Sequence, residues 1–304
     1  MTSPPGASSP LPGALPSPGA GSSPLPIPAD LHSHTSYSHG QAGTREMFEA
    51  ACRAGLAIFG FTEHSPRPPE FLYPRDYQET LVRRLPDYAA EVLELKELGR
   101  ERGVTVLLGL ELDYFPGRED FAEEVIRAYP FDYIIGGLHF QGRWGFDFTP
   151  DDWKDLGEEE RFAVYARYYR DLAAMCRSGL FTIAAHPDLV KIFSPDSFRD
   201  WLGTEKALAL VREALTAIRE AGMLLEVSSA GLRRSCNEIH PAPPIMRLAR
   251  ELGVPISFGS DAHCANTPAF AFDALARYAR AFGYEQSEVI VQGKRSSLPI
   301  GAVP

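Results

Sequence analysis

Short apolar runs that are rich in β-branched residues alternate along this chain with longer amphipathic segments. The short runs predict seven strands, at residues 31–34, 58–62, 105–110, 133–137, 182–185, 224–227 and 255–258. The amphipathic segments predict helices over residues 44–54, 76–102, 158–177, 204–221, 245–252 and 270–282. This alternation is typical of parallel strands joined by right-handed crossovers, which either close into a barrel or open into a doubly wound sheet.

Four residues carry signals for the ends and the continuity of the first two helices. Thr44 is a candidate N-cap and Gly55 a stop signal for the first helix, and Gly103 ends the second. Pro86 lies inside the second helix. We expect it to kink or split that helix, because proline has no amide proton and clashes with the preceding turn.

Seven of the histidines in this chain, with one glutamate and one aspartate, stand at or just beyond the ends of the apolar runs. These nine residues are His32, His34, His39, His64, Glu111, His139, His186, Asp261 and His263. Six of the seven predicted strands deliver at least one of them. A barrel aims the C-terminal end of every strand at one mouth, whereas an open sheet gathers function at a switch point between a few strands. The ligand positions therefore favour the barrel, an α/β fold.

Imidazole nitrogens and carboxylate oxygens are the ligands that borderline-soft divalent metals prefer. His32 and His34 are two residues apart and so lie on the same side of an extended strand, where they can bind one ion together. His39 follows in the next loop. Nine candidate ligands exceed what one ion needs, so the sequence predicts more than one metal.

Composition narrows the class of protein. At 304 residues, with 44% hydrophobic and 23% charged residues, the chain can form one barrel or two smaller domains. A formal net charge of -10 argues against a nucleic-acid-binding surface. The four cysteines are far apart, so neither a thiolate zinc site nor a disulfide framework is indicated and a reducing cytoplasm fits best. We find no membrane span and no signal peptide in the sequence.

Three segments follow from these patterns. Residues 1–29 consist almost entirely of Pro, Gly, Ser, Ala and Leu without a charged side chain, which predicts a disordered extension. Residues 30–293 form the predicted domain, and residues 294–304 are expected to be a tail.

The strand ends also carry a family resemblance. Six segments resemble successive motifs of the polymerase and histidinol phosphatase (PHP) superfamily: DLHSHTSYSH, TEHSP, GLELDYFP, IIGGLHF, AAHPDLVK and GSDAH. Within it, HSP after the second strand, ELDYFP after the third and GLR after the sixth resemble the histidinol-phosphate phosphatase branch. The resemblance runs from Asp30 to about Val291. It implies a distorted seven-stranded (β/α) barrel of the PHP type, similar to a TIM barrel, with a trinuclear metal site.

The resemblance also implies how the nine ligands divide among three divalent ions, which would be zinc, iron or manganese. The first ion would be held by His32, His34, Glu111 and Asp261. The second would be held by Glu111, acting as a bridge, with His139 and His186, and the third by His39, His64 and His263.

A charge argument connects such a cluster to hydrolysis of phosphate monoesters. The substrate is a dianion that repels hydroxide, and its transition state spreads charge over the equatorial oxygens. Clustered divalent ions lower the pKa of bound water and stabilise these oxygens. The expected nucleophile is therefore a metal-bound hydroxide, without a covalent phosphoenzyme. Asp261 and His263 are the candidates to pass a proton to the leaving alkoxide.

Arg233 is the candidate substrate-binding residue, because a guanidinium group matches phosphate in a bidentate manner and the family uses this arginine for phosphate. Lys191 is a second candidate of the same kind. Asp188 and Glu63 are expected to orient ligand imidazoles. His240 stands where related enzymes often have tyrosine and is expected not to bind metal.

Two aromatic features have simpler expectations. The tyrosines at positions 165, 168 and 169 are expected to pack on the outside of the barrel. Trp144 and Asp147 lie in a WGFD run that resembles the family, and we expect them to shape the mouth that receives the substrate. Ser228 stands where family members commonly have asparagine, and this departure falls among the contacts expected near the amino or imidazole end of the substrate.

The resemblance implies a phosphoric monoester hydrolase that converts L-histidinol phosphate to L-histidinol and phosphate in histidine biosynthesis. The partners would then be a small phosphate ester and metal ions, without nucleic acid or membrane, and the oligomeric state stays open. One alternative is a PHP phosphoesterase that acts on another small monoester or a nucleotide. A metal-storing scaffold is disfavoured because all nine ligands and Arg233 are present. An amidohydrolase-like barrel is disfavoured because no lysine follows a middle strand in the expected position.

Overall fold

The computed structural model describes residues 25–71, 75–291 and 293–303. The predicted extension therefore lies outside the described residues up to position 24. Its last five residues belong to the folded domain: Ile27 is 1% exposed and sits in the core, and Ala29 begins the first strand. The domain thus starts earlier than predicted, because an apolar side chain and a parallel strand pairing follow the proline-rich stretch.

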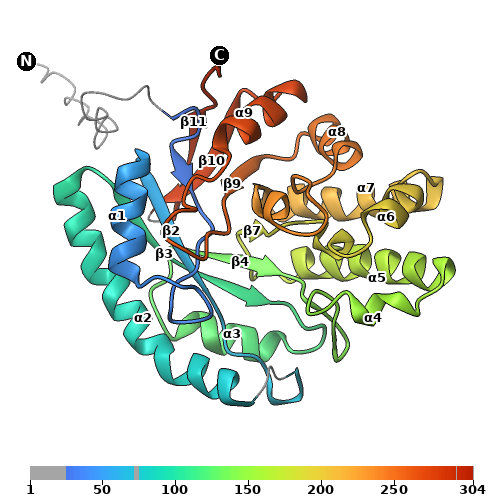
Figure 1. Cartoon of the computed structure of the whole chain (residues 1–304), viewed down its shortest axis with the longest axis horizontal. Helices are drawn as coiled ribbons and strands as arrows, with labels where there is room; N and C mark the ends of the chain where they lie inside the picture. Colours follow the sequence, from blue (N-terminus) through green and yellow to red (C-terminus); the bar gives the residue numbers. More distant parts are fainter. Residues whose placement is uncertain (1–24, 72–74, 292, 304) are drawn as a thin grey trace, which may run out of the picture.

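Seven parallel strands form the central sheet in the order β1-β2-β3-β4-β7-β8-β9. Their bounds are β1 Ala29–Asp30, β2 Ile58–His64, β3 Thr105–Asp113, β4 Tyr133–Gly137, β7 Ile183–Ala184, β8 Leu224–Ser228 and β9 Ile256–Gly259. The two edges meet just beyond β1 and β9. Leu31 N donates to Phe258 O over 3.0 Å, and His34 N donates to Ala262 O over 2.8 Å. The sheet is therefore a nearly closed barrel, and the predicted fold is confirmed (Figure 1).

Helices surround the strands (Figure 1). In the described residues they are α1 Thr44–Ala54, α2 Arg75–Arg102, α3 Glu119–Arg127, α4 Asp151–Lys154, α5 Glu158–Arg177, α6 Pro195–Leu202, α7 Glu205–Glu220, α8 Pro243–Leu252 and α9 Phe272–Ala281. All six predicted helices are present. The sequence did not predict α3, α4 and α6, which span only one to three turns and give little periodic signal.

The structure agrees with the predicted end of α1 but differs from the predictions for its N-cap and for Pro86. Gly55 is left-handed with φ of 83° and ends α1, as predicted. The N-cap position is Gly43 rather than Thr44, whose hydroxyl instead donates to Glu91 over 2.5 Å. Helix α2 runs through Pro86 without being split. Burial of Tyr88, which donates its hydroxyl proton to Gly109 O over 2.7 Å, fixes this helix against β3 on the C-terminal side of the proline.

Two hairpins were not predicted. Strands β5 Phe140–Gln141 and β6 Trp144–Gly145 form a short hairpin directly after β4. Strands β10 Gln286–Val291 and β11 Lys294–Pro299 pair in antiparallel fashion. The tail predicted from residue 294 is therefore wrong, because this segment forms a strand and buries Leu298, which is 5% exposed.

The core has two parts. One lies between the sheet and the surrounding helices, and it includes the predicted tyrosines of α5, which are at most 1% exposed. The other fills the barrel where the strands begin, and its members include Leu31, Ile58, Tyr133 and Leu224. Val289 of β10 and Leu298 of β11 belong to this inner core. The second hairpin therefore covers the N-terminal end of the barrel and leaves the opposite end for polar groups. No helix in the described ranges is long and apolar enough to cross a membrane.

Candidate metal centre

The polar end of the barrel collects the nine predicted ligands. His64 is the last residue of β2, and the parallel register places it beside Glu111 of β3. The loops that leave β1, β4, β7 and β9 supply the other seven: His32, His34, His39, His139, His186, Asp261 and His263. Of the nine, only His39 and His263 are more than 9% exposed, so the cluster is mostly shielded from solvent.

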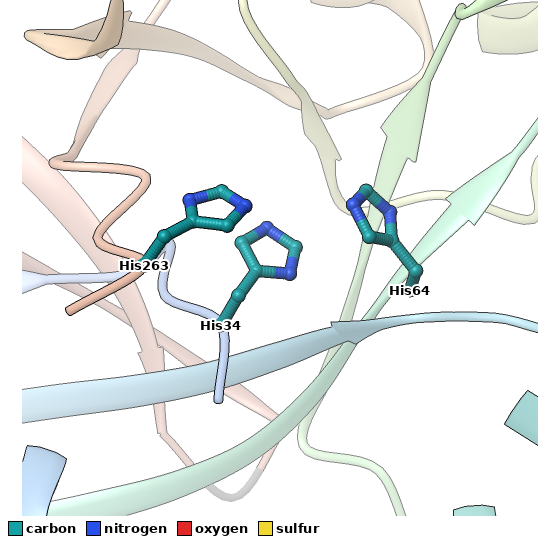
Figure 2. Close-up of side chains that lie close together, drawn as sticks. All are labelled: His34, His64 and His263. Atoms are coloured by element: carbon teal, nitrogen blue, oxygen red, sulfur yellow. The ribbon is translucent and has the colours of Figure 1, made fainter. Parts of the chain in front are cut away.

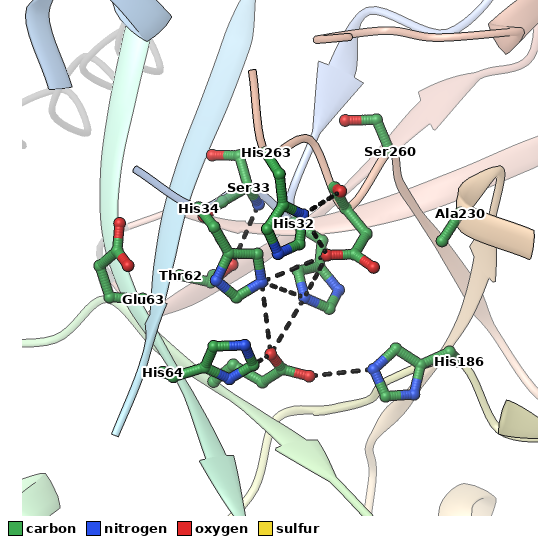
Figure 3. Close-up of polar contacts among 12 residues, drawn as sticks. His32, Ser33, His34, Thr62, Glu63, His64, His186, Ala230, Ser260 and His263 are labelled. Atoms are coloured by element: carbon green, nitrogen blue, oxygen red, sulfur yellow. Dashed lines mark hydrogen bonds and ion pairs between the residues drawn. The ribbon is translucent and has the colours of Figure 1, made fainter. Parts of the chain in front are cut away.

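Glu111 contacts two sets of imidazoles. Figure 3 shows the side chains of His34, His64 and His186 from these sets at this end of the barrel. Its Oε2 atom is 3.1 Å from His64 Nδ1 and 3.3 Å from His34 Nε2. Its Oε1 atom is 3.0 Å from His186 Nε2 and 3.7 Å from His139 Nε2. A carboxylate in this position can use its two oxygens on two neighbouring ions.

Asp261 occupies the opposite side of the same group. Its Oδ1 atom is 3.2 Å from His34 Nε2, 3.7 Å from His32 Nε2 and 3.4 Å from His263 Nδ1. The backbone of Asp261 is left-handed with φ of 51°, a conformation that aspartate tolerates better than most residues. This backbone turn after β9 directs the carboxylate back over the barrel.

A third group consists of stacked rings. His34 comes from the loop after β1, His64 from the end of β2 and His263 from the loop after β9, and Figure 2 shows the three side chains close together. The His34 ring centroid is 4.4 Å from those of both His64 and His263. His39 joins them, at 4.4 Å from His263 and 4.9 Å from His64, and its Nδ1 atom is 3.1 Å from the hydroxyl of Tyr77.

These donor atoms fit divalent metals. Ligands at about 2.1 Å from an ion are about 3.0–3.5 Å apart along the edges of an octahedron or tetrahedron, which matches most of the separations around Glu111 and Asp261. The Nε2 atoms of His32 and His34 are 3.1 Å apart, and Nε2 of His263 is buried without a hydrogen-bond partner. Facing nitrogens and a buried nitrogen without a partner are costly unless a cation satisfies them.

Three compact groups of potential ligands occur among the described residues, with donor atoms within 4.8 Å of one another: His32, His34 and Asp261; His32, Glu111 and His186; and His34, His64 and His263. The first falls within the set predicted for the first ion. The second and third combine residues from different predicted sets. The structure brings all nine residues together, while the division among ions stays a prediction.

The carboxylates and some of the imidazoles of the site are held in the forms that bind metals. Burial would raise the pKa of Glu111, but the imidazoles of His32, His64 and His139 hold it well below its usual range, so the carboxylate is ionised. Partial burial lowers the pKa of His263 to about 3, which keeps that ring neutral. Burial would lower the pKa of His34 and of His139, but neighbouring carboxylates raise it to about 9, so these two rings must lose a proton to bind a metal. Ionised carboxylates and neutral imidazoles are the forms that coordinate metals.

Comparison with known proteins agrees with this geometry. Residues 30–230 match the PHP domain. The chain belongs to the PHP domain family. A protein of Deinococcus radiodurans named "Probable histidinol-phosphatase" is 35% identical over 84% of this chain and 93% of its own length. The "Histidinol-phosphatase" of Bacillus subtilis is 30% identical over 81% of this chain and 97% of its own.

A solved structure shows the same fold. It is histidinol phosphate phosphatase from Lactococcus lactis, in complex with zinc, L-histidinol and phosphate. It superposes on this PHP domain with a TM-score of 0.69 at 20% identity and covers 88% of this chain and 98% of that one.

Several carboxylates that hold the ligands of this PHP domain in place were missed from the sequence. Glu226 of β8 is 2.7 Å from His32 Nδ1 through Oε1 and accepts from His186 N over 2.6 Å through Oε2. Asp113 of β3 bonds Nδ1 of His139. The sequence signal for Asp113 was its spacing of two residues from Glu111, which places both on one face of a strand.

Two residues predicted to orient ligand imidazoles have other hydrogen-bond partners. Glu63 accepts a hydrogen bond from Thr35 N over 2.5 Å and so fixes the loop after β1. Asp188 binds Nδ1 of His240, which is fully buried, and takes no part in holding a metal-ligand ring. That His240 does not bind metal stays a prediction.

A cavity of about 420 Å³ lies over the cluster. Its wall includes Glu111, His186, Asp261 and His263 from the cluster, together with Arg234. Further lining comes from His39, His64, Tyr77, His139, Asp147, Phe148, Leu189, Ile192, Ala230 and His240. Of the two residues expected to shape the mouth, Asp147 lines the cavity and Trp144 does not; Trp144 lies against Trp153 instead, with ring centroids 5.3 Å apart.

The basic residues near the cavity differ from the prediction. Arg233 Nη2 donates to the backbone oxygens of Ser260 and Asp261, over 2.7 and 2.9 Å, and its Nη1 atom is buried without a partner. The side chain that lines the cavity is that of Arg234. The prediction for Lys191 is wrong. Its ammonium group is buried 2.9 Å from Asp188 and 3.1 Å from Glu238, because a buried carboxylate requires a nearby cation.

Proposed function

We propose that the protein is a metal-dependent phosphatase that hydrolyses L-histidinol phosphate to L-histidinol and phosphate in the cytoplasm, as a step of histidine biosynthesis. The observation that carries the proposal is the cluster of nine donors under a small cavity with an arginine on its wall. The named relatives, which the chain matches over nearly their whole length, support the choice of substrate.

The proposed ligand sets for three divalent ions, zinc, iron or manganese, are those given by the resemblance. His32, His34, Glu111 and Asp261 would hold the first ion, Glu111, His139 and His186 the second, and His39, His64 and His263 the third. The two oxygens of Glu111 face His64 and His186 respectively, which supports a bridging role. When bound, such ions supply Lewis-acid stabilisation of phosphoryl oxygens and lower the pKa of water.

The remaining tasks would fall to side chains of this chain. Arg234 lines the cavity, and the buried Nη1 atom of Arg233 lacks a partner, so these two groups are proposed to bind the phosphate dianion. Asp261 and His263 are proposed to pass a proton to the leaving oxygen. Nδ1 of His263 lies 2.9 Å from Asp261 O, which holds the ring in a fixed orientation and leaves Nε2 as the nitrogen available to the cluster.

The test joins metal analysis to kinetics. The purified protein is analysed for bound metals, and phosphate release from histidinol phosphate is measured before and after chelation. We expect at least two ions per chain, release that chelation abolishes, and recovery on adding metal. Fewer than two ions under metal-replete conditions would contradict the cluster.

A panel of monoesters and nucleotides tests the substrate separately. We expect histidinol phosphate to give the highest kcat/KM of the panel. Negligible release from it by a fully metallated protein would contradict the substrate, and a higher kcat/KM for another monoester or a nucleotide would replace it by the alternative PHP phosphoesterase.

A further inference from the structure

Asp147 lines the cavity but has no task in the site described so far. It follows the β5–β6 hairpin, and both of its neighbours are held in place. Phe146 is fully buried, donates its amide proton to His139 O over 3.2 Å and accepts from Trp153 Nε1 over 2.7 Å. Phe148 packs edge-on against Phe140, with ring centroids 5.4 Å apart. The backbone around Asp147 is thus fixed, and its side chain is turned toward the cavity.

One carboxylate oxygen of Asp147 lacks a partner in the structure. Its Oδ1 atom is buried and has no hydrogen-bond partner. Burial raises its pKa, and the neighbouring charges of His139 and Arg67 only partly offset this effect. Arg67 is already paired with Asp113. A buried carboxylate without a partner is unfavourable, and a cation that enters the cavity would relieve this cost.

Asp147 is not one of the nine proposed metal ligands. It is absent from the compact ligand groups of the described residues. Orienting the ring of His139 does not require it either, because Asp113 already binds Nδ1 of that ring. Three carboxylates line the cavity, and Glu111 and Asp261 belong to the cluster. Among the described residues, Asp147 is therefore the cavity-lining carboxylate that is not assigned to the metal centre.

The surroundings of Asp147 suit an organic cation. Phe148, the next residue along the chain, lines the same cavity and is 50% exposed, one of the few large apolar side chains with that exposure among the described residues. An aromatic face beside a carboxylate is favourable for an ammonium or imidazolium group. Arg234, which is proposed to bind the phosphate, lines the same cavity and carries the opposite charge.

We infer that Asp147 is a specificity-determining residue that binds a cationic N–H group on the leaving alcohol of the substrate, with Phe148 covering that group. The inference rests on the proposed function, since L-histidinol carries both an amine and an imidazole. A cation site at Asp147 explains how the protein would select monoesters of cationic alcohols over those of neutral alcohols. The metal cluster cannot make this selection, because it contacts the phosphate group that all monoesters share.

The test uses the metallated full chain and Asp147→Asn, which keeps the shape of the side chain and removes its charge. Values of kcat/KM are compared for histidinol phosphate and for p-nitrophenyl phosphate, which has no cationic group. We expect a loss of about 10- to 100-fold for histidinol phosphate, as for a hydrogen bond to a charged group, and a change within about twofold for the neutral ester.

Two shortened substrates identify the cation. The phosphate ester of 2-aminopropanol carries only the amine, and that of 3-(imidazol-4-yl)propanol carries only the imidazole. For the ester that contains the group bound by Asp147, kcat/KM is expected to fall in Asp147→Asn. For the other ester, kcat/KM is expected to change as little as for the neutral ester. Inhibition of p-nitrophenyl phosphate hydrolysis by L-histidinol should weaken by a similar factor in the variant.

The matched control is Asp152→Asn. Asp152 lies on α4 in the same segment, is exposed and accepts from Trp144 Nε1 over 3.4 Å outside the cavity. We expect wild-type kinetics for it on all esters. Thermal unfolding of Asp147→Asn should occur at the wild-type temperature or higher, because the substitution removes an unpaired buried charge, whereas loss of a structural contact would lower it.

The outcomes separate the two proposals. If the wild-type protein prefers histidinol phosphate and Asp147→Asn keeps that preference, the inference about Asp147 is wrong and the proposed function stands. An equal loss on the cationic and neutral esters overturns the inference as well, because it shows a role outside recognition of the cation. If the wild-type protein hydrolyses the neutral ester with the same kcat/KM as histidinol phosphate, the proposed substrate is wrong. The inference about Asp147 is then wrong too.

Discussion

The two ends of the seven-stranded barrel bury opposite kinds of side chain, apolar at one end and polar at the other. Where the strands begin, the interior is filled by apolar side chains such as Ile58, Ile183 and Leu224, and the β10–β11 hairpin covers it. Where the strands end, imidazoles and carboxylates are buried around Glu111. Burial of apolar side chains therefore stabilises one end of the barrel. Burial of polar groups at the other end lowers the free energy of unfolding unless cations bind there. This contrast predicts that substitutions at the two ends change different observables.

The largest effect is expected from Glu111→Gln at the polar end. The variant loses the charge that faces both sets of imidazoles, and we expect kcat to fall by at least about 1,000-fold, the range typical for loss of an essential electrostatic group. Phosphate release and metal content by mass spectrometry check this, with Glu123→Gln on the exposed face of α3 as the control. A variant with full metal content and activity above a tenth of wild type would contradict the central role of Glu111.

Asp188→Asn tests how the polar end tolerates its buried charges. The ammonium group of Lys191 would remain buried beside a neutral amide, and we expect the free energy of unfolding to fall by about 3 kcal/mol at pH 7. Burial would raise the pKa of Asp188, but Lys191 and His240 hold it below its ordinary value of 3.8. Its contribution is therefore fully present above pH 3.8 and is lost as the pH falls through the lowered pKa.

The difference in stability between wild type and Asp188→Asn should accordingly stay constant from about pH 5 to 8 and shrink only in acid. Urea unfolding at several pH values measures it. The exposed pair Asp151–Lys154 gives the control Asp151→Asn, for which less than about 0.5 kcal/mol is expected. A stability difference that grows as the pH falls would contradict the sign of the pKa shift.

Leu298→Ala tests the apolar end. Leu298 is 5% exposed in the inner core, so we expect a loss of about 2–3 kcal/mol in the free energy of unfolding. The kcat/KM for the substrate should stay within about twofold, because the site lies at the other end of the strands. Val82→Ala, at a side chain that is 56% exposed, should change neither quantity. A loss of activity without a loss of stability would show that the two ends are not separate.

The smallest effect is expected from Tyr133→Phe. The Tyr133 hydroxyl donates to Leu31 O over 2.7 Å across the barrel interior. Its removal leaves that oxygen without this donor, so we expect about 1 kcal/mol of destabilisation and unchanged kcat. Urea unfolding and phosphate release measure the two quantities. A change in metal content would indicate that the apolar end also sets the geometry of the cluster.

The sequence predicted most of what the apolar end and the ligand cluster require. Strand β4 and helices α1 and α5 have the predicted bounds, because the apolar side chains that mark each of them in the sequence are buried in the structure. All nine ligands meet, because parallel strands in a barrel end at one mouth. The hairpin from residue 286 was missed, because Leu298 is the single buried residue of β11 among exposed neighbours and gives a weak signal.

The polar contacts around the cluster could not be predicted in the same way. Which carboxylate supports which imidazole depends on the distance between side chains that are far apart in the sequence. Glu226 and His32 are separated by 194 residues, for example. Lys191 and Asp188 are only three residues apart, but their pairing depends on the 3₁₀ turn at Leu189–Lys191, which the sequence did not predict.

The two described ends of the domain are joined by a hydrogen bond, since Gly301 N donates to Pro26 O over 2.8 Å. Residue 26 precedes β1, so this junction lies at the end of the barrel where the strands begin, away from the cavity. A short linker between these positions would therefore allow circular permutation, with new termini opened in a surface loop. A tether at either end would likewise hold the enzyme on a support with its mouth facing the solution.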